Sequence, residues 1–183
     1  APSNNWSSVA ASADGTNLVA VAAAVWDYQV TNWVGEGAIY CSVDAGATWA
    51  RTSAPSNSWS AVASSADGAK LVAVAGMQYN WSLQSHSGDG SIYCSLDAGA
   101  TWTRTSAPTN SWSAVAASVD GTKCVATART HYDTRGKVLG FIYTSTNSGA
   151  TWAATTAPSN DWHAVASSAD GTKLVAAASE GNG

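Results

Sequence analysis

The chain has 183 residues, of which 45% are hydrophobic and 11% are charged, and its net charge is −4. This composition predicts a packed protein and excludes a disordered, charge-rich chain. The eight Lys and Arg residues are scattered along the sequence, so no basic face exists to bind a phosphate backbone. We therefore expect no nucleic-acid partner.

No apolar run approaches the roughly 20 residues that a membrane-spanning helix needs, so no membrane span is expected. The first residues, Ala1 to Ser3, lack the charged and apolar segments of a secretion signal. We interpret the sequence as that of a secreted, extracellular protein from which any signal has been removed.

The chain is one tandem repeat, because the segment 54–68 recurs with few changes at three other places. The copies begin at Ala1, Ala54, Ala107 and Ala157, with spacings of 53, 53 and 50 residues. Repeats of this length indicate propeller blades or solenoid coils, whose units bury their apolar faces only against neighbours. We predict a single repeat domain over 1–183, with blade copies 1–53, 54–106 and 107–156 and a half-copy 157–183.

Each copy is predicted to begin with two strands joined by a tight turn. The first strand runs from the Trp of an Asn-x-Trp element, as in 59–65, and the second is small and apolar, as in 70–75. The Asp-Gly dipeptide between them, Asp67-Gly68 in this copy, readily takes the positive φ values of a hairpin. The apolar second strand predicts that both of its faces are covered, which places these two strands innermost.

Two further strands complete each full copy. The third strands are predicted at 38–43, 91–96 and 141–146, and each leads into a second glycine turn. The fourth strands begin at Trp49, Trp102 and Trp152 and are polar, as outer, edge-like strands are. Four strands in about 50 residues match the size of one blade. The predicted fold is therefore an all-β β-propeller of four-stranded blades, with about three and a half blades and fourteen strands per chain.

The second turn carries a recurring motif, Ser-x-Asp-x-Gly-x-Thr-Trp, at 42–49 and 95–102, and with Asn in place of Asp at 145–152. A carboxylate and a hydroxyl can accept hydrogen bonds from turn amides, and the glycine permits a left-handed conformation. The motif resembles that of the Asp-box (BNR-type) repeat β-propellers, which include sialidases, some endoglucanases, sortilin-like receptors and photosystem assembly factors. The resemblance covers nearly the whole chain and implies the fold. It implies little about activity, because the motif has a structural role in those families.

The chain departs from this family pattern in two places. Asn147 replaces the Asp of the third motif and can still cap the turn, and the fourth copy reaches Gly183 before any such motif. Either the half-blade completes a four-bladed ring within the chain, or several chains join into a larger ring. We favour the second alternative and predict a homo-oligomer, because the resemblance to Asp-box propellers implies a ring of six or more blades.

The three cysteines are predicted to be free, buried thiols. Cys124 occupies the position of a core leucine, such as Leu71, and Cys41 and Cys94 are equivalent residues of adjacent copies. Equivalent positions of neighbouring blades usually lie beyond the ~7 Å limit for a disulfide. No spacing of Cys and His suggests a zinc site, so we predict neither a metal nor another cofactor.

The loops between the second and third strands differ most between copies and are longer than hairpins need. They span 23–37, 76–90 and 129–140 and share one edge of the predicted propeller. Their aromatic, His and charged side chains, interleaved with Asn and Gln, are the candidate ligand-binding residues. These residues are Trp26, Tyr28, Trp33, Tyr79, Trp81, His86, His131, Tyr132, Asp133 and Arg135.

Aromatic rings that stack on a pyranose, beside amides that bond its hydroxyls, suit a carbohydrate-binding lectin with several similar sites. The alternative is a non-catalytic protein-interaction or structural propeller whose aromatic residues pack or form interfaces. The family's sialidases resemble one another in a cluster of three arginines that grips the substrate carboxylate. The four arginines of this chain cannot supply such a cluster, so a glycosidase is less favoured. We therefore predict glycans as partners, no catalytic residues and no enzyme activity.

Overall fold

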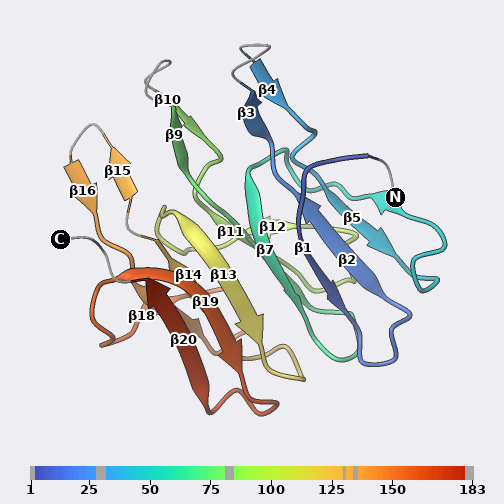
Figure 1. Cartoon of the computed structure of the whole chain (residues 1–183). Coiled ribbons are helices and arrows are strands. Elements are labelled where there is room, and N and C mark those ends of the chain that lie inside the picture. The colour runs from blue at the N-terminus through green and yellow to red at the C-terminus, as the bar shows by residue number, and fades with distance from the viewer. Residues whose placement is uncertain (1–2, 28–31, 81–84, 130, 134–135, 180–183) are drawn as a thin grey trace.

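The structure is a computed structural model and describes residues 3–27, 32–80, 85–129, 131–133 and 136–179. These residues form twenty β-strands and no helix (Figure 1). Fourteen strands build three four-stranded antiparallel sheets and one final pair, and six strands build three smaller two-stranded ribbons. We number the units 1 to 4 by these sheets in chain order.

The first and second strands of each unit form an antiparallel pair. The first strands are β1 (Trp6–Ala11), β7 (Trp59–Ser64), β13 (Trp112–Ala117) and β19 (Asp161–Ser167). The second strands are β2 (Leu18–Ala22), β8 (Leu71–Ala75), β14 (Cys124–Ala128) and β20 (Leu174–Ser179).

The third and fourth strands extend the sheets of units 1, 2 and 3 outward. The third strands are β5 (Ile39–Ser42), β11 (Ile92–Ser95) and β17 (Ile142–Ser145). The fourth strands are β6 (Ala50–Arg51), β12 (Thr103–Arg104) and β18 (Ala153–Ala154). Each fourth strand has only two paired residues and begins one residue after the Trp at which the sequence predicted its start.

The sheets fan out side by side, with β1 at one end and β19–β20 at the other (Figure 1). The first strands of successive units pack on one another, β7 on β1, β13 on β7 and β19 on β13. Each four-stranded sheet therefore places its first strand inward and its short, exposed fourth strand outward. The chain is an all-β partial β-propeller of about three and a half blades, as predicted.

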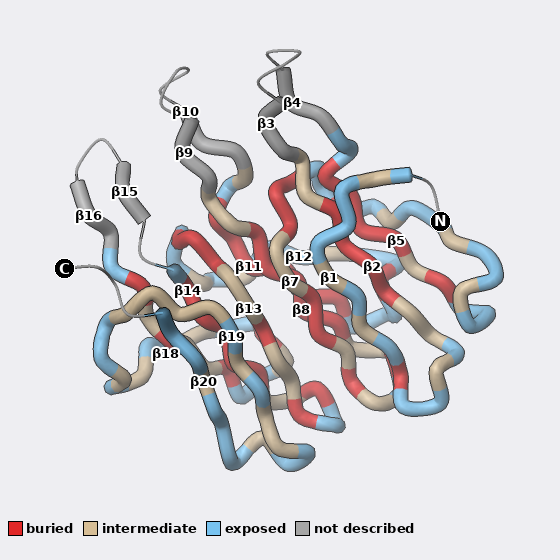
Figure 2. Tube along the Cα trace, in the orientation of Figure 1, coloured by how far each residue is buried: buried red, intermediate tan, exposed pale blue. Residues whose placement is uncertain are grey.

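Two apolar cores lie between the sheets of neighbouring units (Figure 2). The strand β8 is buried along its whole length, because sheets cover both of its faces. Trp59 and Trp112 are fully buried, and their indole N–H groups donate to the Gly37 and Gly90 carbonyl oxygens at 2.9 Å. Each indole thus fastens its unit to the preceding one.

The turns before the fourth strands, which we call the Thr-Trp turns (42–49, 95–102 and 145–152), share one hydrogen-bond pattern. In the second turn, the Thr101 amide and hydroxyl donate to the Asp97 carboxylate at 2.8 and 2.6 Å. In the third turn, the Thr151 amide donates to Asn147 Oδ1 at 2.9 Å and Asn147 Nδ2 donates to Thr151 Oγ1 at 2.8 Å. Asn therefore caps this turn as the sequence predicted.

The three cysteines are free thiols, in agreement with the sequence analysis. Cys94 and Cys124 are buried, whereas Cys41 is only half-buried. Burial raises the pKa of the Cys41 thiol to about 11 and that of Cys124 to about 12, because a thiolate loses its hydration there. These thiols stay protonated and serve as small apolar side chains.

Candidate functional site

The predicted binding loops are not plain loops, because each contains an antiparallel ribbon. The ribbons are β3 (Val25–Asp27) with β4 (Asn32–Val34), β9 (Gln78–Asn80) with β10 (Ser85–Ser87), and β15 (His131–Asp133) with β16 (Gly136–Val138). Pairing satisfies backbone groups that a loop of this length would otherwise leave to water. The sequence analysis missed these six strands because it read the variable segments as irregular.

The three ribbons stand on the same edge of the fan, one for each full unit (Figure 1). The Asp-Gly and Thr-Trp turns lie together on the opposite edge, where the Ala98 amide donates to the Ala69 carbonyl oxygen at 2.9 Å. The connections that end in Asn-x-Trp lie with the ribbons, since the Asn57 amide donates to the Gly37 carbonyl oxygen at 2.8 Å. The two edges are therefore arranged as predicted.

Seven of the ten candidate residues lie in ribbon strands, where the structure describes the backbone only. Trp26 and Trp33 are directly opposite each other in the first ribbon, and Tyr79 and His86 are opposite in the second. The third ribbon carries His131, Tyr132 and Asp133 on β15. The remaining three candidates, Tyr28, Trp81 and Arg135, lie outside the described residues.

Two acids at the bases of the ribbons hold the ribbons to their blades. The Tyr93 hydroxyl donates to Asp89 Oδ2 at 2.9 Å, and Asn57 Nδ2 donates to Asp89 Oδ1 at 2.7 Å. Burial, then the bond to Asp89, raises the pKa of Tyr93 to about 12, so the phenol stays a donor. In unit 1, the Tyr40 hydroxyl donates to Glu36 Oε2 at 2.6 Å in the same way.

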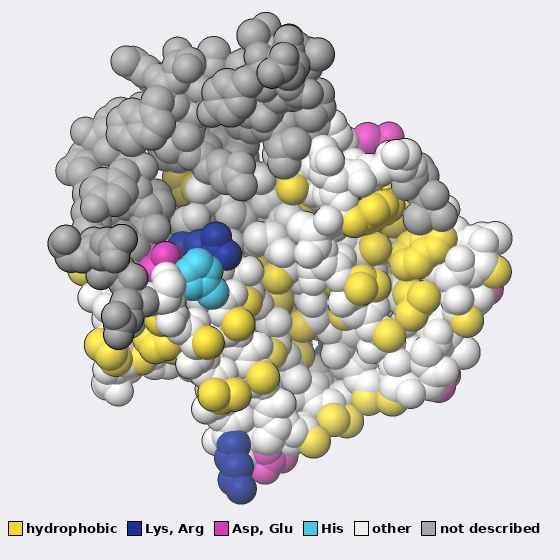
Figure 3. Space-filling model, in the orientation of Figure 1, with side chains coloured by type: hydrophobic (Ala, Val, Ile, Leu, Met, Phe, Trp, Pro, Cys, Tyr) yellow, Lys and Arg dark blue, Asp and Glu magenta, His cyan; other side chains and the backbone are white. Residues whose placement is uncertain are grey.

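A hollow of about 280 Å³ opens at the base of the ribbons, next to the first strands. Side chains of the first three units line it, from Ser7, Ala23, Ser58, Trp59, Ser60, Gly76, Met77, Ser111, Trp112, Ser113 and Arg129. Five serines and Arg129 supply the polar side chains of its wall, beside the apolar side chains of Trp59, Met77 and Trp112. Among the residues that the structure describes, charged side chains are sparse on the face drawn in Figure 3.

Three equivalent serines of this hollow bridge neighbouring units. Each lies at a β-bulge in the first strand; in unit 2 the register shifts between Trp59 and Ala61. The Ser60 hydroxyl lies 3.0 Å from the Val74 carbonyl oxygen of its own unit and 2.8 Å from the Trp112 carbonyl oxygen of the next. These hydroxyls are used by the fold, which leaves Arg129 as the exposed charged group of the hollow.

The sequence analysis did not select Arg129 or Met77 as site residues. Arg129 takes the position held by Ala23 and Gly76 in the other copies, and its amide donates to the Ser111 carbonyl oxygen at 2.8 Å. The alignment of the repeats therefore already showed an Arg at a position that small residues occupy in the other copies. Only the packing shows that this position borders a hollow.

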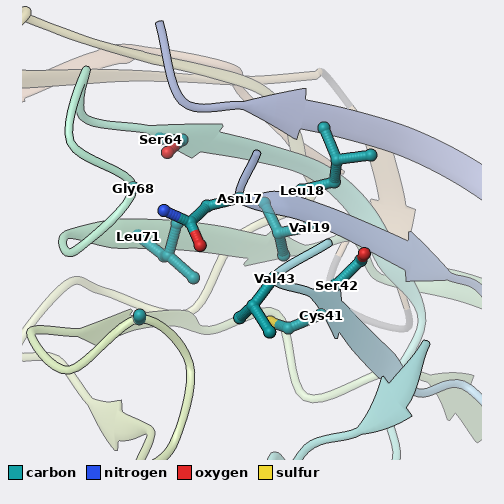
Figure 4. Close-up of a pocket in the computed structure, with 10 residues that line it drawn as sticks. Asn17, Leu18, Val19, Cys41, Ser42, Val43, Ser64, Gly68 and Leu71 are labelled. Atoms are coloured by element: carbon teal, nitrogen blue, oxygen red, sulfur yellow. The ribbon is translucent and has the colours of Figure 1, made fainter. Parts of the chain in front are cut away.

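A second kind of crevice lies on the opposite edge, between units 1 and 2 (Figure 4). Leu18, Cys41 and Leu71 line a space of about 10 Å³, which holds at most about one water molecule. Such a space is a packing feature and offers no room for an organic ligand.

Among the residues that the structure describes, no group of three or more His, Cys, Asp or Glu side chains could hold a metal ion. The described part of the chain likewise has no helix that is long and apolar enough to span a membrane.

Comparison with known proteins identifies the fold of this chain and no more specific family. No protein-family model matches the chain, and no curated protein matches it. Similar solved structures include an ancestral GH74 enzyme, with 15% identity, a TM-score of 0.68, and coverage of 97% of this chain and 24% of that chain. TolB from Acinetobacter baumannii has 19% identity, a TM-score of 0.62, and coverage of 98% and 39%.

A third similar structure is YCF48 bound to a D1 peptide, with 14% identity, a TM-score of 0.60, and coverage of 97% of this chain and 49% of that chain. The chain thus spans less than half the length of each of these structures. At such identities the likeness shows a shared propeller fold.

Proposed function

We propose that this protein is a non-catalytic binding module that recognises glycans with the ribbon edge of its blades. The observation that carries the proposal is the placement of three similar ribbons, one per full unit, on one edge of a rigid scaffold. Each ribbon segment carries aromatic residues, the first two also carry Asn and Gln, and the ten candidate residues all belong to these segments. A shared edge supports several weak sites that act together by multivalency.

The chemistry of the ribbons suits sugars better than charged ligands. An indole or phenol ring covers the apolar face of a pyranose, and Asn, Gln and Asp side chains bond its hydroxyls. The hollow at the base of the ribbons adds Arg129 and a serine-rich wall to this edge. We propose that the ligands are extracellular glycans and that the protein is secreted.

The proposal excludes hydrolysis as the main role. Most glycosidases use two carboxyl groups that flank the scissile bond. Two of the acids in the variable segments, Glu36 and Asp89, already accept hydrogen bonds from Tyr40 and Tyr93. These carboxylates serve to anchor the ribbons, which supports a binding role over a catalytic one.

We also propose membership of the Asp-box propellers. The support is the Thr-Trp turn, whose serine, acid and threonine form the closed hydrogen-bond set expected of a structural motif. In unit 1, for example, Ser42 Oγ donates to Asp44 Oδ1 at 2.7 Å and the Trp49 indole donates to the Gly46 carbonyl oxygen at 3.1 Å.

A glycan array with the full chain tests the function, followed by titration calorimetry with the best glycan. We expect binding to at least one glycan class. Trp26→Ala and Trp81→Ala should each weaken it by about tenfold, the loss of about 1.4 kcal/mol from one stacked ring. Val43→Ala is the matched control, because Val43 is exposed on the opposite edge and its loss should leave binding unchanged. An array without any retained glycan contradicts the proposal.

A second candidate is recognition of a peptide by the same edge, favoured by the likeness to YCF48, which is bound to a D1 peptide in its structure. An exposed ribbon strand can pair with an extended peptide by β-addition. A peptide array read in parallel with the glycan array separates the two. Peptide binding that Trp26→Ala abolishes, without glycan binding, would favour this candidate.

A further inference from the structure

The hollow at the base of the ribbons has walls from three consecutive units. Units 1, 2 and 3 each contribute the bridging serine of the first strand and the residue that follows the second strand. The residues that follow the second strands are Ala23, Gly76 and Arg129. The hollow therefore lies where units contact one another within the chain, and not on the free face of unit 1 or unit 4.

The size and position of the hollow fit a single sugar residue of a longer glycan. Its volume is about 280 Å³, slightly below the roughly 300–1,000 Å³ of pockets that enclose a drug-sized ligand. Ala23, Gly76 and Arg129 each lie just before a ribbon strand, so the ribbons begin at the rim of the hollow. A glycan with one residue in the hollow thus has the ribbons beside its remaining residues.

The two tryptophans of the hollow offer no face on which a sugar ring could stack. The side chains of Trp59 and Trp112 are 0% and 1% exposed, because they are packed between units. Their indole N–H groups already donate to the Gly37 and Gly90 carbonyl oxygens. Recognition within the hollow therefore depends on its polar groups.

The serines of the hollow have acceptors within the fold for their protons. Ser7 Oγ lies 3.0 Å from the Val21 carbonyl oxygen and 2.7 Å from the Trp59 carbonyl oxygen, and Ser60 and Ser113 repeat this arrangement. The other two serines of the wall donate to carbonyl oxygens of the preceding unit at 3.4 and 3.1 Å. A hydroxyl has one proton, so the wall is rich in acceptors and its serines have no proton to give to an anion. Such a wall suits the hydroxyl groups of a sugar.

Among the described residues that line the hollow, Arg129 is the only charged one. Its side chain is exposed, and a guanidinium presents a planar fork of N–H donors that pairs with an oxyanion through two parallel hydrogen bonds. Because Ala23 and Gly76 take this position in units 1 and 2, one divergent residue of the repeat gives the wall its charge. Arg129 therefore supplies the donors that the serines lack.

The acid of unit 4 that takes the position of Ser111 in the repeat is engaged by other groups. Asp161 Oδ2 accepts a hydrogen bond from Ser179 Oγ at 3.1 Å and lies 3.2 Å from His163 Nε2. Figure 3 shows basic, acidic and histidine side chains gathered at one place on this face. The ion pairs of the described residues join His163 to Asp161 and Arg51 to Glu36, and neither of them uses Arg129.

We propose that the hollow binds one sugar residue that carries an anionic group, either a carboxylate or a sulfate ester. Arg129 pairs with the anionic group, and the carbonyl and serine oxygens of the wall accept hydrogen bonds from the hydroxyls of the same residue. The ribbons contact the uncharged remainder of the glycan. This inference rests on the proposed function, because it names the class of glycan that the ribbon edge selects.

Matched glycans on the array test the class of ligand. The sets are glucose, glucuronate and sulfated glucose, and galactose, galacturonate and sulfated galactose, each at the same terminal position. We expect the neutral member of a set to bind about tenfold more weakly than the carboxylate or sulfate member, and these two members separate the sources of charge. Equal binding of neutral and anionic members would overturn this inference and leave the proposed function standing. An array without any retained glycan would instead contradict the proposed function.

Removal of the guanidinium tests the role of Arg129. Arg129→Gln should weaken binding of the anionic glycan by about tenfold and leave binding of its neutral counterpart unchanged. A rise from about 0.05 M to about 0.5 M sodium chloride should weaken binding to the wild type but not to Arg129→Gln. Lys173→Gln is the matched control, because it removes the same charge from an exposed residue on the opposite edge. Unchanged binding in Arg129→Gln, or an equal loss in Lys173→Gln, would overturn the inference.

Transfer of the guanidinium to another unit tests its place in the hollow. The double variant Ala23→Arg/Arg129→Gln puts the charge at the equivalent position of unit 1, which also lines the hollow. It should recover part of the lost affinity for the anionic glycan, whereas Val43→Arg/Arg129→Gln should not, since Val43 is exposed on the opposite edge. Circular dichroism shows whether each variant folds. A folded Ala23→Arg/Arg129→Gln variant without any recovery, or equal recovery in the Val43→Arg variant, would contradict the inference.

Discussion

Val72 in unit 2 and Val175 in unit 4 hold the same position of the repeat, yet 3% of the first and 68% of the second is exposed. Leu71 and Leu174 differ in the same way, with 4% and 45% exposed. The local sequences around them are nearly identical. The difference teaches that burial in this protein comes from the neighbouring unit and from the outer strands, whereas the strand itself forms in both places.

The crevices between units show the same contrast. Between units 1 and 2 the space is about 10 Å³, and Ala98 of a Thr-Trp turn helps to fill it. The equivalent space between units 3 and 4, lined by Cys124, Thr144 and Leu174, is about 250 Å³. The described part of unit 4 has no Thr-Trp turn to occupy it. Each turn on this edge is therefore a packing element for the unit before it.

The largest expected effect compares two tryptophans at the same position of the repeat. Trp59 is fully buried between units 1 and 2, whereas Trp6 is 38% exposed. Trp59→Ala should lower the free energy of unfolding by about 3–5 kcal/mol, because it leaves a cavity in the core. Trp6→Ala should cost less than about half as much. Urea unfolding of dilute protein measures both, and equal losses would contradict the dependence on a neighbouring unit.

A glycine pair isolates the contact between units from backbone strain. Gly46 and Gly99 have φ values of 87° and 89° in equivalent turns, so alanine is strained equally in both, by about 1–2 kcal/mol. A Cβ at Gly99 would lie 2.6 Å from Cys41 Sγ of the preceding unit, whereas at Gly46 the nearest atom is Leu18 Cδ1 at 3.2 Å. Gly99→Ala should therefore lower the unfolding free energy by about 1 kcal/mol more than Gly46→Ala. The double variant Gly99→Ala/Cys41→Ala should recover part of that difference in unfolding free energy. Strictly additive effects of the two substitutions would refute the contact.

The valine pair gives a smaller but cleaner comparison. Val72→Ala should cost about 2 kcal/mol, since two buried methyl groups are lost at about 0.8 kcal/mol each and a cavity remains. Val175→Ala should stay within about 0.5 kcal/mol of the wild type, as surface changes usually do. Thermal unfolding at low concentration, below any association between chains, measures the difference.

The smallest effect concerns acid. Hydrogen bonds from Thr101 and Ser95 lower the pKa of Asp97 to about 2, from an ordinary value of 3.8. Because the folded state holds this proton less tightly than the unfolded chain, the stabilisation is present above pH 3.8 and is lost as the pH falls through about 2. Asp97→Asn should reduce the acid sensitivity in this window, as Asn147 already does in the third turn. An unchanged pH profile of unfolding would show that this turn does not contribute.

The repeat alignment predicted the four-stranded blade and the two edges correctly, and it failed in the variable segments. The Asp-Gly and Thr-Trp turns are local hydrogen-bond patterns within a few residues, such as Ser42 with Asp44, so their sequence suffices to identify them. The ribbons have no such signal. Glu36 and Asp89 gave no sign in the sequence that they accept bonds from Tyr40 and Tyr93, four residues further on.

The sequence by itself determined the number of strands in a blade, the positions of the turns and the identity of the apolar second strand. These features follow from residue periodicity and from the conformations that Gly, Asp and Asn allow. Only the tertiary structure decided that Arg129 borders a hollow and that Val175 is exposed while Val72 is buried. Both depend on which unit lies alongside, and contacts between units about 50 residues apart are set by packing rather than by any local pattern.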